Sequence, residues 1–181
     1  MNGLLQAREE NVRRLRRNKS RRFDTEPFRP PEEVSMNAAG LGAVSIESAF
    51  ERVIEPAPAD FDELGHVNNA VYLRWAQEIA IAHWRLVSTP EMLTGYLWVV
   101  LRHEIDYRDQ ILPGDAVIGR TWLGKAEGPR FERFIDIRKP GALRAAASVK
   151  STWCLLDAET RRPRRVGADI LDAFQIQHIR V

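Results

Sequence analysis

A cluster of residues capable of acid–base or nucleophilic chemistry lies in the segment 60–69. It contains the carboxylates Asp60 and Asp62, together with Gly65, His66 and the amide pair Asn68-Asn69. A carboxylate can act as general base or nucleophile. Free N–H groups at a helix N-terminus can stabilise a carbonyl oxygen that becomes negative. Asp, Asn and Gly are also ordinary capping residues, and on residue types alone capping is the simpler interpretation.

The element that must position this cluster is the segment that follows it. Residues 69–87 contain neither Gly nor Pro, which predicts a long helix. At 100° per residue the polar side chains Arg74, Gln77, Glu78 and Arg85 share one narrow stripe, and nearly all others are apolar. A helix that is apolar over most of its circumference is expected to be buried on most sides.

The rest of the chain supplies segments that could wrap around this helix. Strand-like runs rich in Val, Ile, Trp, Tyr and Thr occur at 50–54, 96–109, 115–126, 130–138 and 144–157. Turn signals separate the last four runs, and residues 139–142 predict a hairpin. One strand, a long helix and four consecutive strands predict an α+β fold, with an antiparallel sheet wrapped around a central helix.

The motif itself resembles a known family. Residues 62–72 read DELGHVNNAVY, with Trp75 and Glu78 following, and are similar to the D-x-x-G-H-V-N-N-x-x-Y signature of hot dog acyl thioesterases. The stretch is similar both to the 4-hydroxybenzoyl-CoA thioesterase branch and to the acyl-ACP thioesterases. The resemblance extends over residues 47–175. The resemblance implies the hot dog fold and hydrolysis of an acyl-CoA or acyl-ACP thioester, as in fatty acid metabolism. It also implies a homodimer or homotetramer, and no metal or redox cofactor.

The resemblance also implies roles for individual residues. Asp62 is expected to activate water or to attack the thioester directly, and the backbone N–H of Gly65 is expected to polarise the thioester carbonyl. His66, Asn68 and Asn69 would orient the water, the carbonyl or the carboxylate. Each has a simpler alternative: Asp62 could cap the helix, His66 could fix the loop's shape, and one of the two asparagines could be an N-cap.

Further candidates lie outside the loop. Glu78 stands where several family members carry a helix carboxylate, although an i,i+4 ion pair with Arg74 is an equal alternative. Tyr72 ends the motif and is a candidate substrate contact. A basic segment could bind the phosphates of CoA or of a carrier-protein arm, or could form a solvated turn. Its candidate residues are Arg161, Arg162 and Arg164.

The remaining reactive side chains favour structural roles. His83 lies opposite the polar stripe of the predicted helix, and His103 and His178 lack nearby ligand partners in the sequence. Cys154 sits in a strand pattern and is expected to be a buried thiol. No cluster has the spacing of a metal site.

Composition and charge limit the other classes of function. The chain has 181 residues, with 29% charged and 44% hydrophobic residues, as in a globular protein. Residues 1–34 carry nine Arg or Lys against six Asp or Glu, whereas the rest has a net charge of −1. We therefore expect residues 1–44 to be a basic, disordered arm and 45–181 to be the hot dog domain. Any nucleic-acid binding would rest on the arm alone. With one cysteine, and no apolar run long enough for a membrane span, a cytoplasmic location is expected.

Two rival functions are compatible with such a fold. A hot dog hydratase or dehydratase would carry D-x-N-P-x-H or H-F-P elements, which the sequence lacks. A non-catalytic module that binds an acyl group or a partner is the rival from another class, since a fold does not fix a function. The complete motif over 62–69 favours hydrolysis.

Overall fold

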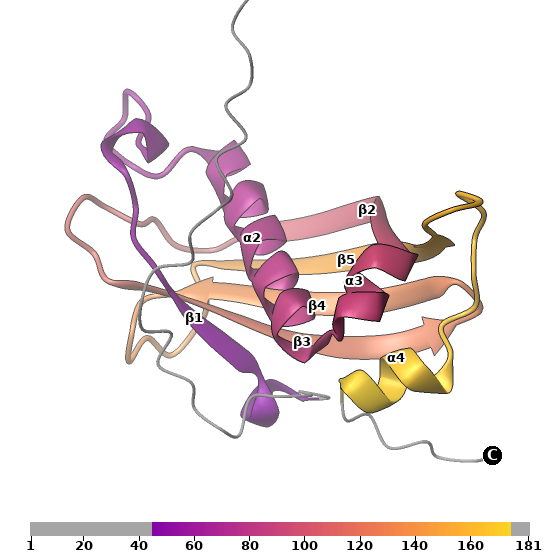
Figure 1. The fold of residues 1–181 in the computed structure, drawn as a ribbon. Coiled ribbons are helices and arrows are strands. Elements are labelled where there is room, and N and C mark those ends of the chain that lie inside the picture. Colours follow the sequence, from indigo (N-terminus) through magenta and orange to yellow (C-terminus); the bar gives the residue numbers. More distant parts are fainter. Residues whose placement is uncertain (1–44, 175–181) are drawn as a thin grey trace, which may run out of the picture. The chain divides into compact units, whose positions relative to one another are not determined.

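A five-stranded antiparallel sheet curves around one long helix in the computed structural model, which describes residues 45–174 (Figure 1). The helix is α2 (Asn69–Val87). The sheet has the order β1-β3-β4-β5-β2. Its strands are β1 (Phe50–Ile54), β2 (Tyr96–Tyr107), β3 (Val117–Glu127), β4 (Arg130–Arg138) and β5 (Ala147–Asp157). The predicted α+β architecture is therefore confirmed, and α2, β1 and β4 have the predicted bounds.

Helix α2 packs across the concave face of the sheet. Trp75 and Ile79 of the helix are almost fully buried, as are Ile135 and Ile137 of β4. Gly119 of β3 permits this close approach, because a Cβ there would lie only 2.1 Å from Cδ1 of Ile79. Burying such side chains stabilises the fold by roughly 1.5–3 kcal/mol each.

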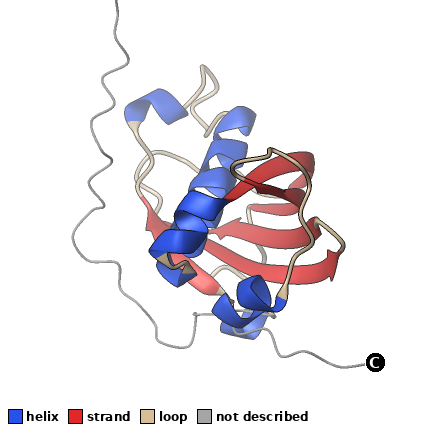
Figure 2. Ribbon diagram, turned by 45° about the vertical axis from the view of Figure 1, so that its right-hand side comes forward, coloured by secondary structure: helices blue, strands red, loops and turns tan. Residues whose placement is uncertain are grey.

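The prediction that α2 is buried on most sides is confirmed only in part, because the predicted polar stripe is exposed but the apolar flanks of the helix are not fully covered. Its buried side chains form one face, and Gln77, Glu78 and Leu86 are exposed. The reason is geometric: the sheet covers only one side of the helix, as Figure 2 shows from a second angle. The apolar side chains on its flanks, such as Ile81, remain half-buried.

Within residues 45–174, four short helices fall outside the sequence predictions. They are the 3-10 helices η3 (Ile46–Ser48) and η4 (Pro58–Asp60) and the α-helices α3 (Pro90–Gly95) and α4 (Ala168–Ala173). Thr89 caps α3 by accepting a hydrogen bond from the Met92 N–H, so the order Thr-Pro was a readable start signal. Helix α4 buries Ile170 against a second apolar cluster that includes Phe131 and Leu155.

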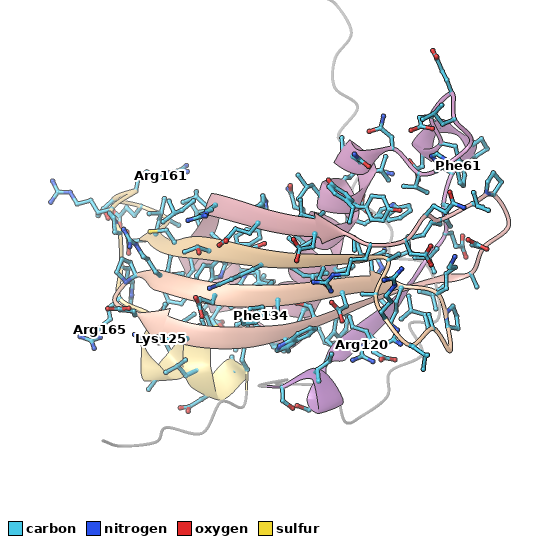
Figure 3. All side chains as sticks on the ribbon, turned by 180° about the vertical axis from the view of Figure 1, so that it is seen from behind. Phe61, Arg120, Lys125, Phe134, Arg161 and Arg165 are labelled. Atoms are coloured by element: carbon cyan, nitrogen blue, oxygen red, sulfur yellow. The ribbon has the colours of Figure 1, made fainter. Side chains whose placement is uncertain are left out.

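The two faces and the edges of the sheet differ. Helix α2 packs on the concave face, and the opposite face carries Phe134 (Figure 3), on whose ring Trp122 stacks. Strand β2 pairs with β5 on one side, and no strand within residues 45–174 pairs with its other side. This edge exposes three consecutive apolar side chains, Val99, Val100 and Leu101.

Two predictions fall on residues that the structure does not describe. The basic arm 1–44 and His178 lie outside the described range. The prediction of a domain beginning at residue 45 stays a prediction. Within residues 45–174, no helix combines the length and the apolar character that crossing a membrane requires.

Candidate active site

A tight turn before α2 holds the Asp62 carboxylate. The Asp62 N–H donates to the carbonyl oxygen of His66 at 2.8 Å, which closes the turn. The carboxylate oxygen Oδ1 accepts hydrogen bonds from the N–H groups of Leu64, at 2.9 Å, and of His66, at 3.4 Å. The other oxygen, Oδ2, has no hydrogen bond to any residue that the structure describes. Asp62 is thus oriented through one oxygen and has the second free for chemistry.

His66 and Gly65 are also fixed by this turn. The His66 ring is partly exposed and its Nδ1 lies 3.9 Å from Asp62 Oδ1, which is too far for a hydrogen bond. Gly65 has φ +77°, a conformation that favours glycine. Its N–H donates to the Asp62 carbonyl oxygen at 3.0 Å. The donor that the family resemblance assigns to the thioester carbonyl is therefore already engaged in the turn.

The two asparagines have different positions at the start of α2. Asn68 is the N-cap, and its Oδ1 accepts a hydrogen bond from the Ala70 N–H at 2.9 Å. This is the capping alternative considered for one of the pair. Asn69 is the first residue of the helix and is exposed, and its N–H has no partner in the described part of the chain. That N–H lies at the positive end of the helix dipole.

Asp60 and Glu78 belong to an ion-pair cluster beside the turn. Asp60 is buried, accepts a hydrogen bond from the Ala57 N–H at 3.0 Å and pairs with the Arg74 guanidinium. Arg74 also lies 3.6 Å from Glu78, as the ion-pair alternative anticipated. Glu78 is roughly 13 Å further along α2 than Asn69. Within one chain it is not brought to Asp62.

A cavity of about 450 Å³ opens beside the Asp62 turn. Of the predicted site residues, it is lined by Asp62, His66, Asn68, Asn69 and Tyr72. Further lining comes from the end of β2 and the residues that follow it, which are Tyr107, Arg108, Asp109 and Gln110. The Tyr107 hydroxyl donates to the Asn69 carbonyl oxygen at 2.9 Å, and its ring meets the buried Tyr72 edge-on. Burial raises the pKa of Tyr72, which therefore stays a neutral phenol.

The basic segment lies at the other end of the sheet. Figure 3 shows Phe61, the neighbour of Asp62, at one end and Arg161 at the opposite end. The ends of β2 are roughly 35 Å apart at the usual rise per residue of a strand. Arg164 stacks on Tyr96, 4.8 Å from the ring centre. The structure therefore does not bring Arg161, Arg162 and Arg164 to Asp62 of the same chain.

A second cavity, of about 320 Å³, lies at this far end. It is lined by the second half of α2, Leu93 of α3, the first residues of β2 and residues within β3, β4 and β5. Its lining is mainly apolar, with the aromatic side chains of Trp84, Trp98, Phe131 and Phe174, and it includes two arginines, Arg85 and the buried Arg133. The sequence analysis missed this cavity. Its only sequence signal was Arg133, a charged residue in phase with the buried Phe131 and Ile135 of one strand.

The side chains expected to be structural have structural contacts. His83 is fully buried and stacks on Phe50. The His103 ring lies 2.8 Å from the Ser151 hydroxyl, and Cys154 is buried. Among residues 45–174, no three His, Cys, Asp or Glu side chains form a group that could hold a metal ion.

Known proteins of similar sequence and structure agree with this architecture. The family model of the thioesterase-like superfamily matches residues 56–174. A thioesterase from Thermus thermophilus, complexed with coenzyme A and Zn, is 25% identical with a TM-score of 0.61, over 69% of this chain and 90% of that one. A 1,4-dihydroxy-2-naphthoyl-CoA thioesterase from Synechocystis shares the fold at 15% identity and a TM-score of 0.61, over 70% and 95% of the two chains.

A probable thioesterase from Escherichia coli has 18% identity and a TM-score of 0.60, over 69% of this chain and 96% of that one. No curated protein sequence matches the chain. The family model nevertheless covers most of the domain, including the Asp62 turn, all of α2 and four of the five strands. The chain belongs to the thioesterase-like superfamily, and its fold is the hot dog fold.

Proposed function

We propose that this protein hydrolyses acyl-CoA thioesters with Asp62 as the catalytic carboxylate. One observation carries the proposal: the same cavity is lined by Asp62, whose Oδ2 has no hydrogen bond to a described residue, and by Asn69, whose N–H is unengaged. A base and an oxyanion donor on one cavity wall suit attack on a carbonyl carbon. Water forms the new C–O bond, the C–S bond breaks, and the sulfur leaves as the thiol after gaining a proton.

Asn69 is the better donor for the thioester carbonyl than Gly65. The Gly65 N–H is already bonded to Asp62, whereas the Asn69 N–H is the first of the helix and points from its positive end. Asn68 supports this arrangement by capping the helix. Asp62 either delivers water as a base or forms a transient mixed anhydride as a nucleophile, and both routes use the same free oxygen.

Coenzyme A is the proposed carrier because the similar thioesterase from Thermus thermophilus is complexed with it. Arg161, Arg162 and Arg164 are exposed and would contact its phosphates, for which arginine forks are suited. An acyl-carrier protein presents the same phosphopantetheine arm, so an acyl-ACP of fatty acid metabolism is the second substrate to test. The buried single cysteine suits a cytoplasmic location.

A homodimer would unite the parts that one chain separates. The free edge of β2, with its exposed Val99, Val100 and Leu101, suits antiparallel pairing with β2 of a second copy. Pairing about the middle of the strand would bring Tyr107 of one copy next to Tyr96 of the other. The Asp62 turn of one protomer would then border the second cavity and the basic segment of its partner. A homotetramer would require a further contact.

The first experiment is release of free thiol from short, long and aromatic acyl-CoAs by the wild type and by Asp62→Asn. Turnover by the wild type and a loss of roughly 100-fold or more in the variant support the proposal. Acyl-ACPs are assayed in parallel. Absence of turnover on both substrate classes would contradict it and would favour a non-catalytic acyl-binding module.

The shared site has its own test. Asp62→Asn removes the carboxylate, and Ile81→Trp obstructs the second cavity, which Ile81 lines. If each site uses Asp62 of one protomer and the cavity of the other, mixed dimers contain one intact site. Mixing the two inactive variants should then restore up to about a quarter of wild-type activity. No recovery on mixing, with exchange shown by mass spectrometry, would refute the shared site.

A further inference from the structure

Arg133 is a buried cation that none of the described carboxylates neutralises. Its side chain projects from the middle of β4 toward the concave face, and the residue is only 6% exposed. Burial lowers the pKa of Arg133 to about 9, so the guanidinium remains charged at neutral pH. An unpaired charge in such a place is strongly disfavoured, so the site favours an anionic partner.

The partners that Arg133 does have are neutral. Its Nη1 donates to the Thr121 hydroxyl at 3.0 Å and lies 3.1 Å from Nδ1 of His83. The pKa of His83 is lowered to about 3 by burial and by the charge of Arg133, so this ring is an uncharged acceptor. The guanidinium also lies 5.6 Å from the centre of the Phe174 ring. Its Nε and Nη2 make no hydrogen bond within the described part of the chain.

A second polar group without a partner belongs to another residue that lines the same cavity. Trp153 of β5 pairs with Phe131 of β4. Phe131 precedes Arg133 by two residues, so the side chains of all three lie on the same face of the sheet. Trp153 and Arg133 both line the second cavity. The indole Nε1 of Trp153 is buried and has no hydrogen-bond partner among residues 45–174. A tryptophan N–H only donates, so both unsatisfied groups call for an acceptor, and the guanidinium for an anionic one.

The size and the walls of the cavity indicate what kind of group the anionic acceptor is attached to. Its volume of about 320 Å³ is at the small end of ligand sites, and Trp84, Trp98 and Phe131 make its walls apolar. An adenine nucleotide would need a larger and more polar site. A short acyl chain fits the apolar walls, and a carboxylate at its far end would meet Arg133.

We propose that the second cavity selects acyl groups that carry a terminal carboxylate, held by Arg133 and by the Trp153 N–H. This inference rests on the proposed thioester hydrolysis and names its substrate class, the thioesters of short dicarboxylic acids. Arg133 and Trp153 act in substrate binding in the cavity of one protomer, and Asp62 of the second copy in the proposed homodimer carries out the chemistry at the other end of the acyl chain.

The test compares thioesters of equal length that differ only at the far end: adipyl-CoA with hexanoyl-CoA, and suberyl-CoA with octanoyl-CoA. The wild type should prefer the carboxylate member of a pair by about tenfold or more in kcat/KM. Arg133→Met should lower kcat/KM for that member by about 30-fold or more, the loss typical of breaking a buried charge pair. It should change kcat/KM for the neutral member by less than about threefold.

Trp153→Phe is the milder variant, because it removes the N–H and keeps an aromatic wall. We expect a loss of about tenfold for the carboxylate member only. Arg133→Lys keeps the charge and should recover part of the preference. A structural role for Arg133 would instead lower kcat/KM for both members equally in Arg133→Met, and that result would overturn the proposal.

A binding measurement separates this proposal from the proposed hydrolysis. Free adipate should raise the Tm of the wild type, whereas hexanoate at equal ionic strength should not, and Arg133→Met should lose the effect. Hydrolysis without preference for either member of a pair would overturn the cavity proposal and leave hydrolysis standing. No hydrolysis of any thioester, with adipate stabilisation that depends on Arg133, would refute the catalytic proposal and support the cavity proposal.

Discussion

The Asp62 carboxylate accepts a 2.9 Å hydrogen bond from the backbone N–H of Leu64, two residues further along the chain. The accepting atom is Oδ1, which also receives the His66 N–H. The amide oxygen of an asparagine can accept the same two bonds. We therefore expect Asp62→Asn to retain the wild-type Tm within about 2 °C while turnover falls roughly 100-fold or more. A melting curve recorded on the assayed sample checks this, and a large drop in Tm would mean that Asp62 mainly supports the fold.

Asp60, a neighbouring carboxylate, provides the matched control for Asp62. Its substitution should lower stability and leave most of the turnover, which is the reverse of the effect expected for Asp62→Asn. It is 5% exposed, receives the Ala57 N–H and pairs with Arg74. Asp60→Ala should lower the free energy of unfolding by about 1–3 kcal/mol, because the Ala57 N–H loses its partner while Arg74, half exposed, is resolvated. Urea unfolding measures the loss. Turnover per folded molecule should fall by less than about tenfold, and a collapse like that of Asp62→Asn would place Asp60 in the chemistry.

A substitution at the exposed edge of β2 should dissociate the proposed dimer. Leu101 is 53% exposed at a bulge of this strand, so a lysine there should not disturb the fold of one chain. Two lysines facing each other across paired edges would repel and would bury unpaired charge. Light scattering should give the mass of one chain for Leu101→Lys and of two for the wild type. Turnover should disappear with the dimer. An active Leu101→Lys monomer would show that one chain holds a complete site.

His83 predicts a dependence of stability on pH. Burial, followed by the charge of Arg133, lowers its pKa from 6.5 to about 3, so the folded state disfavours the proton. Below pH 6.5 the unfolded chain takes up this proton and the folded chain does not. The contribution of neutral His83 to the free energy of unfolding is therefore complete above pH 6.5. As the pH falls toward 3, this contribution is lost at up to about 1.4 kcal/mol per pH unit.

Urea unfolding of the wild type and of His83→Gln between pH 4 and 7 measures this contribution. The ring is packed by Phe50, Phe174 and Arg133, so the variant will be less stable overall. The informative quantity is the slope of unfolding free energy against pH, which should be shallower in His83→Gln by about that amount per pH unit. Equal slopes would show that His83 takes up its proton in the folded state.

Local patterns predicted much of the fold. The bounds of α2 followed from a Gly- and Pro-free run between a polar loop and Ser88, and those of β1 and β4 from short runs closed by Pro and Gly. Helices α3 and α4 were missed because one turn or two of helix leave no periodicity to detect. Their burial depends on contacts with distant strands, as with Ile170 against Phe131.

The residues of the candidate site also fall into those that local sequence predicted and those that only the tertiary structure brings together. The residues 62–72 are consecutive, so their spacing alone placed Asp62, Asn68 and Asn69 at the start of a helix, where backbone geometry fixes their hydrogen bonds. Arg133, Trp153 and His83 are far apart in the chain and meet only when β4, β5 and α2 pack. The sequence by itself determined the motif, the family and the element order, which are local properties. Only the tertiary structure decided which N–H groups are free, which end of the sheet holds the basic segment, and where a charge is buried without a partner, because those depend on contacts between distant residues.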